Sequence, residues 1–505
     1  MAALNERSTQ PVGRRPHIGL SGGAIALFVG LAAVRVGLLL SSQNALSGDE
    51  ATVGVVARHI LSQGERPVFA YGADYNGGAA LTAYIGAALF ALFGAGETVL
   101  KTIPLAYSLA AVVVVYLFVR SAEGEAAGIW AALLYGTSVS LLKWNFDARG
   151  GYAECQLLVP VTLWVLWARV LSGGPFEAAL VGLLCGFGTY VLQMFAPVGV
   201  TSFAYIGLGD RRLRKWAAMA GGCLVGLLPV LLRGAPAGAV GFSPGVSGRT
   251  LLAAPFKIFE TLTRLLPGLF SYENFEGYPP LRAFPNLLEY GLLLFGATVI
   301  VFRRPSWQGP EAGNRRSATA LWAAYALIYL LLFSLHPLAS HSPRYLLFLV
   351  PAFSVLTAVG VRRALEKTSP PALRALGAVL VALVLVERGY ETLRLSRDDR
   401  IFGPDGPSSP RTADEVIRAV EERGITRVVT EDWDLGWRIV FKTGERIQTS
   451  HNLNNLHQPP PLAVVVTARS EDDQRVRDLL EKRGSVFERL TIADKAVYAV
   501  TVGPG

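Results

Sequence analysis

The chain has 505 residues, of which 51% are hydrophobic and only 17% are charged, and its mean hydropathy is +0.39. Soluble domains carry roughly 25% charged residues, so this composition excludes an ordinary soluble protein and indicates an integral membrane protein. The net charge of +9 does not point to nucleic acid, because residues 388–505 are almost neutral and the basic excess lies in the apolar part, where Lys and Arg fix membrane orientation.

The apolar part predicts eleven membrane-spanning helices, since about 20 residues of helix cross a hydrocarbon core of roughly 30 Å. The first run has no small-residue cleavage site after it, so we expect a retained helix and not a signal peptide. The predicted spans lie near residues 20–40, 99–119, 126–142, 154–172, 176–193, 194–209, 216–232, 286–302, 318–335, 345–360 and 372–386.

A further apolar stretch, residues 79–93, would reach only about 22 Å as a helix at 1.5 Å per residue. If it does not cross, the basic groups at 211–215, 303–304 and 362–363 all face the cytoplasm, in agreement with the positive-inside rule. We therefore expect a re-entrant or juxtamembrane helix here. The N-terminus is then cytoplasmic, and the C-terminal tail is extracytoplasmic.

This topology places four loops on the same outer side: residues 41–78, 143–152, 233–285 and 336–344. Arg35 lies within the first span, where a charge is costly in hydrocarbon, so we expect it to face the protein interior. The three cysteines, Cys155, Cys185 and Cys223, lie in or beside apolar stretches without CxxC spacing. They are interpreted as core residues and not as disulfides or metal ligands.

Composition changes near residue 387, and a linker rich in Pro, Gly and Ser follows at 403–410. Beyond it, hydrophobic periodicity predicts helices at 412–422 and 472–483 and strands at 427–430, 462–467 and 496–502. The fold class is therefore a mainly α polytopic membrane protein with a small C-terminal α/β domain. The predicted domains are 1–387, in the membrane, and 388–505, outside it.

Two adjacent carboxylates, Asp49 and Glu50, follow the first span at the start of a helix-like segment that continues to residue 61. Acidic residues stabilise helix N-termini, so one interpretation is a cap with first-turn charge. The other is general-base catalysis, in which a carboxylate at the membrane surface accepts the proton of an attacking hydroxyl. Both interpretations stay open from the sequence.

The layout resembles the GT-C glycosyltransferases of the protein O-mannosyltransferase and aminoarabinose transferase type. The shared features are an Asp-Glu pair after the first span, a large outer loop with the segment 71–78, a basic position at Lys101, and Arg344-Tyr345 at the outer end of a late span. The resemblance implies that Asp49 is the catalytic carboxylate. One departure is Asn76-Gly77-Gly78, where aminoarabinose transferases carry Lys-Pro-Pro. Either Lys101 or Arg344 replaces that lysine, or the donor is held differently.

A second acidic cluster lies in the turn 143–152, which contains Asp147 and Arg149. It is either a solvated loop bent by its two glycines or part of a site for donor or acceptor. Related enzymes place a second outer acidic residue between early spans, which favours Asp147.

His336, His341 and Arg344 form a third group. The two histidines lack i, i+4 spacing and a clear third ligand, so a divalent metal is possible but not indicated. A basic pocket for phosphate, with Arg344 as the fork and His341 assisting, is the preferred interpretation; an interfacial anchor is the alternative for Arg344.

Together these features predict an inverting glycosyltransferase that moves a sugar from a polyprenyl-phosphate donor to a lipid, glycan or protein acceptor at the outer face of the cell membrane. Asp49 and Glu50 are the predicted catalytic residues. The predicted donor-binding or substrate-binding residues are Lys101, Asp147, Arg149, His341, Arg344 and Tyr345. No nucleotide cofactor is expected. A lipid or sugar transporter or flippase, or a non-catalytic cell-envelope assembly subunit, is the alternative.

Overall fold

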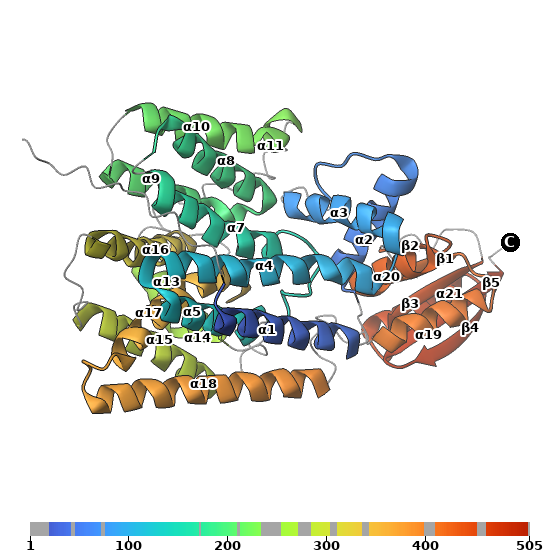
Figure 1. Ribbon diagram of the computed structural model, residues 1–505. Helices are drawn as coiled ribbons and strands as arrows, with labels where there is room; N and C mark the ends of the chain where they lie inside the picture. Colours follow the sequence, from blue (N-terminus) through green and yellow to red (C-terminus); the bar gives the residue numbers. More distant parts are fainter. Residues whose placement is uncertain are drawn as a thin grey trace, which may run out of the picture.

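The computed structural model describes residues 20–41, 46–71, 76–170, 173–209, 213–233, 254–270, 284–302, 311–335, 343–397, 410–451 and 461–502. Helices fill most of these ranges, and a small sheet with its own helices lies at one end of the helical bundle (Figure 1).

Each of the eleven predicted spans coincides with a helix or with two helical segments in succession. In chain order these are α1 (Gly22–Ser41), α4 (Glu97–Glu123), α5 (Glu125–Gly136) with α6 (Val139–Leu142), α7 (Tyr152–Val165) with the π-helix η1 (Leu166–Val170), α8 (Pro175–Val191), the 3-10 helix η2 (Gln193–Phe195) with α9 (Ala196–Gly209), α10 (Leu213–Gly226) with α11 (Leu228–Arg233), α15 (Phe284–Phe302), α16 (Glu311–Leu335), the 3-10 helix η7 (Pro343–Leu349) with α17 (Val350–Leu365), and α18 (Pro371–Arg397).

In the described ranges, four of these segments are long and apolar enough to cross a membrane: α1, α4, α7 with η1, and η7 with α17. Shorter apolar helices lie at 77–93, 175–191, 287–302 and 318–334. The chain is therefore a multi-pass membrane protein, while the count of eleven crossings stays a prediction.

Three short helical segments lie where the sequence predicted only an outer loop. They are α13 (Ala254–Glu260), the π-helix η3 (Thr261–Leu265) and α14 (Leu266–Leu269). Leu265 and Leu269 are buried, and the hydroxyl of Thr261 accepts a hydrogen bond from Ser334 of α16 at 3.1 Å. Packing against the bundle stabilises these segments, which are too short and too interrupted for a span to be read from hydropathy.

Helices α8 and α10 pack through glycine. A Cβ added to Gly182 would lie 2.0 Å from the carbonyl oxygen of Met219, and one added to Gly222 would lie 2.0 Å from that of Ala179. Backbones can approach this closely only where side chains are absent, which is how small residues join helices inside membranes. Any larger residue at these two positions would separate the helices.

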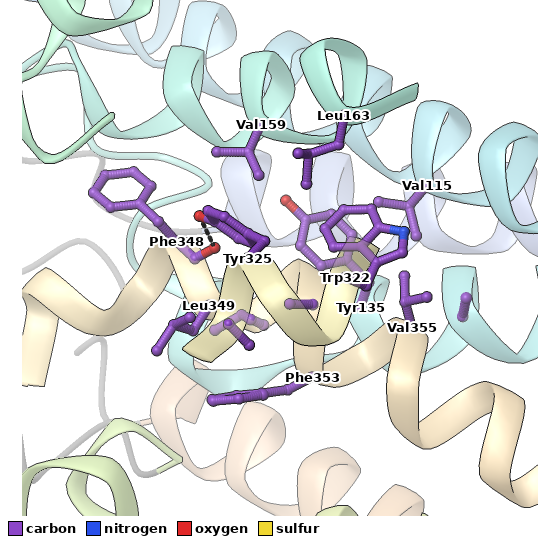
Figure 2. Packing of buried hydrophobic residues seen from close by; sticks show 14 of the residues in the cluster. Val115, Tyr135, Val159, Leu163, Trp322, Tyr325, Phe348, Leu349, Phe353 and Val355 are labelled. Carbon is purple, nitrogen blue, oxygen red and sulfur yellow. Dashed lines mark hydrogen bonds between the residues drawn. The ribbon is translucent and has the colours of Figure 1, made fainter. Parts of the chain in front are cut away.

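The core of the membrane part lies where helices α4, α5, α7, α16 and α17 meet η7. Aromatic and branched side chains from these elements interdigitate, and the hydroxyl of Tyr325 donates to the carbonyl oxygen of Phe348 at 2.9 Å (Figure 2). Figure 2 labels Val115, Tyr135, Val159, Leu163, Trp322, Tyr325, Phe348, Leu349, Phe353 and Val355. The buried Cys155 belongs to the same core and is a free thiol, as are Cys185 and Cys223.

Arg35 of α1 faces the protein interior, as its position in the first span predicts, and is 3% exposed. Its guanidinium donates to the hydroxyl of Ser108 at 2.9 Å and to the carbonyl oxygen of Gly136 at 2.8 Å. These contacts join α1 to α4 and α5. They supply the polar partners that a charge within a span requires.

The C-terminal part is a five-stranded sheet in the order β2-β1-β3-β5-β4. Strands β1 (Arg427–Thr430), β2 (Gln448–Ser450) and β3 (Leu462–Thr467) run parallel, whereas β5 (Lys495–Val502) is antiparallel to both β3 and β4 (Val486–Ile492). The helices of this part are α19 (Pro410–Glu421), α20 (Trp433–Thr443) and α21 (Glu471–Lys482). The predicted α/β character is therefore present, but α20, β2 and β4 were missed.

The predicted boundary at 387/388 falls within a helix. Helix α18 continues through it without a break to Arg397. The next described residues begin α19, at Pro410. A helix in the membrane part thus extends past the point at which the composition changes.

Candidate functional site

Helix α2 (Gly48–Gln63) begins at the Asp-Glu pair, and its N-terminus is closed by a capping box. The hydroxyl of Ser47 accepts from the backbone N–H of Glu50, and the Glu50 carboxylate accepts from the backbone N–H of Ser47 at 2.8 Å. Such a box satisfies two donors that the first helical turn leaves without partners. The cap interpretation is therefore confirmed for Glu50.

The Glu50 carboxylate also joins three elements. It forms an ion pair with Lys101 of α4, with 2.7 Å between Nζ and Oε1, and accepts from the backbone N–H of Ala148 at 2.8 Å. Glu50 is 3% exposed and Lys101 is 2% exposed. These contacts make Glu50 a structural link between α2, α4 and the turn 143–151. Its predicted role in proton transfer, and the predicted contact of Lys101 with a donor phosphate, stay predictions.

The turn between α6 and α7 packs directly on the start of α3 (Gly77–Phe93), and glycine on both sides makes this possible. Gly150 has a φ of +78°, and a Cβ on it would lie 2.4 Å from the backbone nitrogen of Ala79. A Cβ on Gly78 would lie 2.3 Å from the backbone nitrogen of Gly151. The side chain of Asn76 caps α3 and donates to the carbonyl oxygen of Gly150 at 3.2 Å. The segment Asn76-Gly77-Gly78, which stands where aminoarabinose transferases carry Lys-Pro-Pro, thus allows this turn to pack against the start of α3.

Asp147 and Arg149 form a fixed pair on this turn. Nε of Arg149 lies 3.0 and 2.8 Å from the two carboxylate oxygens of Asp147, and the guanidinium lies over the ring of Trp144. Burial raises the pKa of Asp147, but the charge of Arg149 outweighs burial and leaves that pKa below its usual value. Burial lowers the pKa of Arg149, and Asp147 and Asp49 more than reverse this effect. Both groups are therefore charged at neutral pH.

Asp49 differs from its neighbour in being open to solvent, with 54% of its side chain exposed. One carboxylate oxygen lies 3.5 Å from Nη1 of Arg149. The other accepts a hydrogen bond from Nε1 of Trp433 at 3.3 Å. Among the described acidic residues named from the sequence, Asp49 combines exposure with a cation at its side. A general base must be within reach of the substrate hydroxyl, and the exposure of Asp49 meets this requirement.

Arg344 and Tyr345 lie in η7, which contacts Tyr152, at the end of the same turn, through Phe348. The ring of Tyr152 packs against Trp144, with centroids 4.1 Å apart, and against Phe348, with centroids 6.0 Å apart. The guanidinium of Arg344 donates to the hydroxyl of Tyr345 at 3.0 Å. The charges of Arg344 and Arg149 are close enough to interact.

The structure thus brings Asp49, Asp147, Arg149 and Arg344 into one region, from segments that the predicted topology places on the same side. His341 and His336 lie outside the described residues. Within the described ranges, no three His, Cys, Asp or Glu side chains are grouped to hold a metal ion.

The sequence did not assign helix α20 to this region. Asp434 accepts from the backbone N–H of Gly48, and Trp433 reaches Asp49. Farther along the interface, Arg58 of α2 lies over the Phe441 ring at 4.3 Å. A Trp-Asp pair shortly after a predicted strand was visible in the sequence, but nothing local showed the helix that it begins or the surface that it meets.

Other proteins of known structure share this architecture. The crystal structure of ArnT from Cupriavidus metallidurans bound to undecaprenyl phosphate matches with a TM-score of 0.57 and 14% identity, over 95% of this chain and 98% of that chain. The apo oligosaccharyltransferase of Archaeoglobus fulgidus matches with a TM-score of 0.53 and 13% identity, over 94% of this chain and 74% of that chain. No family model matches the sequence, and no curated protein matches it.

At 13–14% identity these matches establish the fold. They extend over both the helical bundle and the C-terminal sheet, since nearly the whole chain is covered. The chain therefore has the fold of the GT-C glycosyltransferases, the aminoarabinose transferase and oligosaccharyltransferase among them.

Proposed function

We propose that the protein is an integral membrane glycosyltransferase that moves a sugar from a polyprenyl-phosphate donor to an acceptor hydroxyl at the outer face of the membrane. The observation that carries the proposal is the exposed carboxylate of Asp49, with Arg149 fixed beside it by the buried Asp147. The fold it shares with ArnT, a protein solved with undecaprenyl phosphate bound, supports the class of donor.

The proposed reaction inverts the anomeric carbon. Asp49 takes the proton of the acceptor hydroxyl while the oxygen of that hydroxyl forms a bond to the anomeric carbon. At the same time the bond from this carbon to the phosphate oxygen breaks. The polyprenyl phosphate leaves with the electron pair of the broken bond. Arg149 and Arg344 stabilise the negative charge that develops on it, because guanidinium groups match phosphate oxygens in geometry and charge.

We assign to Arg149 the contact with the donor phosphate that the sequence suggested for Lys101. The Lys101 ammonium contacts Glu50 and the carbonyl oxygen of Phe146, whereas the Arg149 guanidinium extends from Asp147 towards Asp49. We propose that Lys101 acts through Glu50, by holding the start of α2 on α4, and that Asp147 acts through Arg149. The proposal also includes the membrane orientation, in which these residues face the extracytoplasmic side and the N-terminus is cytoplasmic.

The experiment uses the full chain in lipid nanodiscs, with undecaprenyl phosphate as the probe for donor binding. Turnover is measured with a panel of radiolabelled undecaprenyl-phosphate sugars, each offered together with lipid, glycan and peptide acceptors that carry a free hydroxyl. We expect the wild type to bind the lipid phosphate and to consume one or more of the labelled donors. Asp49→Asn should keep lipid binding and lose turnover, whereas Asp147→Asn should weaken lipid binding by releasing Arg149. A wild-type protein that binds no undecaprenyl phosphate, or an Asp49→Asn variant with normal turnover, would reject the proposal.

A further inference from the structure

An indole of the C-terminal domain stands beside the candidate base. Trp433 is 42% exposed although it is a large aromatic side chain, and its Nε1 lies 3.3 Å from a carboxylate oxygen of Asp49. The tryptophan begins α20, three residues after the end of β1. A half-exposed ring thus adjoins a carboxylate that is itself half exposed.

The Trp433 ring packs against two other rings of the C-terminal domain. Trp437 packs edge-on against it with centroids 5.6 Å apart, and the His451 ring lies 4.9 Å from it. His451 can occupy that place only because position 436 is glycine, where a Cβ would lie 2.2 Å from the imidazole. Asp432 caps α20 by accepting from the backbone N–H of Leu435. These contacts therefore fix the orientation of the Trp433 ring, although the ring itself is not buried.

The same cap is anchored to the sheet and to the membrane part. Asp432 forms an ion pair with the buried Lys495 at 2.9 Å. Asp434 accepts from the backbone N–H of Gly48, and a Cβ on Gly48 would lie 2.6 Å from Cδ1 of Trp433. The distance between the indole and Asp49 is thus set by contacts on both sides of the interface.

Trp433 lies just beyond an edge of the sheet at which α/β domains bind ligands. Strands β2, β1 and β3 are parallel, so their carboxyl ends share one edge. Trp433 follows β1 at this edge, and His451 follows β2. Ligands of open α/β sheets bind beyond the carboxyl ends of the strands, and here that edge faces Asp49.

We infer that Trp433 forms the acceptor subsite and that the acceptor is a carbohydrate whose pyranose ring stacks on the exposed indole face. A pyranose presents a face of C–H groups, which suits an aromatic surface, and hydroxyls around its rim. A ring stacked on Trp433 places a rim hydroxyl at Asp49, because the edge of the indole is already in contact with that carboxylate. This inference rests on the proposed function and selects the glycan among the lipid, glycan and protein acceptors that the sequence left open.

The test measures binding of sugars and of the donor lipid separately, on the full chain in nanodiscs. The sugar probes are a panel of neutral, amino and acidic disaccharides, whose binding is detected by saturation-transfer NMR. The lipid probe is undecaprenyl phosphate. We expect at least one disaccharide to bind through its ring protons. Trp433→Ala should weaken that binding roughly tenfold or more, and Trp433→Phe, which keeps a flat ring, should stay within about threefold of the wild type. Trp216→Ala, at the partly exposed tryptophan of α10, is the matched control and should bind sugar as the wild type does.

Several results overturn the inference. Binding of no disaccharide, or equal binding by the wild type and Trp433→Ala, removes the sugar subsite, as does Trp433-dependent binding of a Ser/Thr peptide in place of a sugar. If Trp433→Phe and Trp433→Ala both lose turnover with unchanged sugar affinity, the indole N–H only positions Asp49. Normal binding of undecaprenyl phosphate in these cases leaves the proposed function standing, whereas its absence in the wild type defeats the proposed function itself.

Discussion

Exchanging each of the two adjacent carboxylates for its amide should separate chemistry from stability. Glu50 is buried in an ion pair with the buried Lys101, so Glu50→Gln leaves an ammonium without its carboxylate inside the protein. Breaking a buried pair in this way costs about 3–5 kcal/mol. Asp49 is exposed, so Asp49→Asn should lose the first-turn charge of α2, about 0.3–1 kcal/mol, and a partly exposed ion pair with Arg149, about 0–1 kcal/mol.

Turnover should respond in the opposite order. Removing a general base lowers the rate roughly 10²- to 10⁴-fold, which corresponds to about 2.7–5.4 kcal/mol of activation free energy at 1.36 kcal/mol per tenfold. We therefore expect Asp49→Asn to unfold close to the wild-type temperature and to be almost inactive. Glu50→Gln should unfold at a clearly lower temperature and, where it stays folded, keep a substantial part of the turnover.

Thermal unfolding in nanodiscs, followed by tryptophan fluorescence, and turnover of the labelled donor give the two measurements. The Glu50→Gln/Lys101→Met double variant is the control, since it removes both charges and should recover part of the stability lost in Glu50→Gln. A Glu50→Gln variant as stable as the wild type, or a double variant with no recovery, would refute the assignment of Glu50 to structure.

Three further predictions follow from the same region. Gly150→Ala should lower thermal stability and turnover together, because its Cβ would meet Ala79. The control Gly64→Ala, also at positive φ but with nothing within 4 Å of its Cβ, measures the backbone strain alone. Equal losses of stability in the two variants would contradict the packing argument. Arg344→Ala should weaken undecaprenyl phosphate binding much more than Arg344→Lys if charge is the main requirement, and equally if the guanidinium fork is needed; unchanged affinity in both removes Arg344 from the site. A C-terminal alkaline phosphatase fusion should be active, since that enzyme requires an extracytoplasmic location; an active cytoplasmic reporter there would reverse the topology.

The C-terminal domain shows where local sequence signals were sufficient and where they were not. The strand predicted at 427–430 is β1, and that at 462–467 is β3, because both are short β-branched runs between polar residues. Helix α20 was missed because its apolar residues 433, 435, 437 and 439 alternate along the sequence, which is the period of a strand and not of a helix. Strand β2 has three residues, too few for a periodic signal, and forms because β1 offers it a parallel partner.

The candidate site divides in a similar way. The sequence named Asp49, Asp147, Arg149 and Arg344 as candidates, and the structure brings them into one region, while their roles stay predictions. Only the resemblance to a known family distinguished Asp49 from Glu50, because the two share the same local context. Their difference arises from Lys101 and Ala148, which approach Glu50 from α4 and from the turn before α7.

The sequence by itself determined that this is a helical membrane protein with a small α/β domain at its C-terminus, because hydrophobic periodicity and charge are local properties that each segment carries independently. The tertiary structure decided which carboxylate is buried and which is open, which cation stands beside it, and that Trp433 of the C-terminal domain reaches Asp49. The physical reason is that burial and charge pairing depend on neighbours from distant parts of the chain. Asp49 and Trp433 are far apart in the sequence, and their contact exists only because α20 packs on α2.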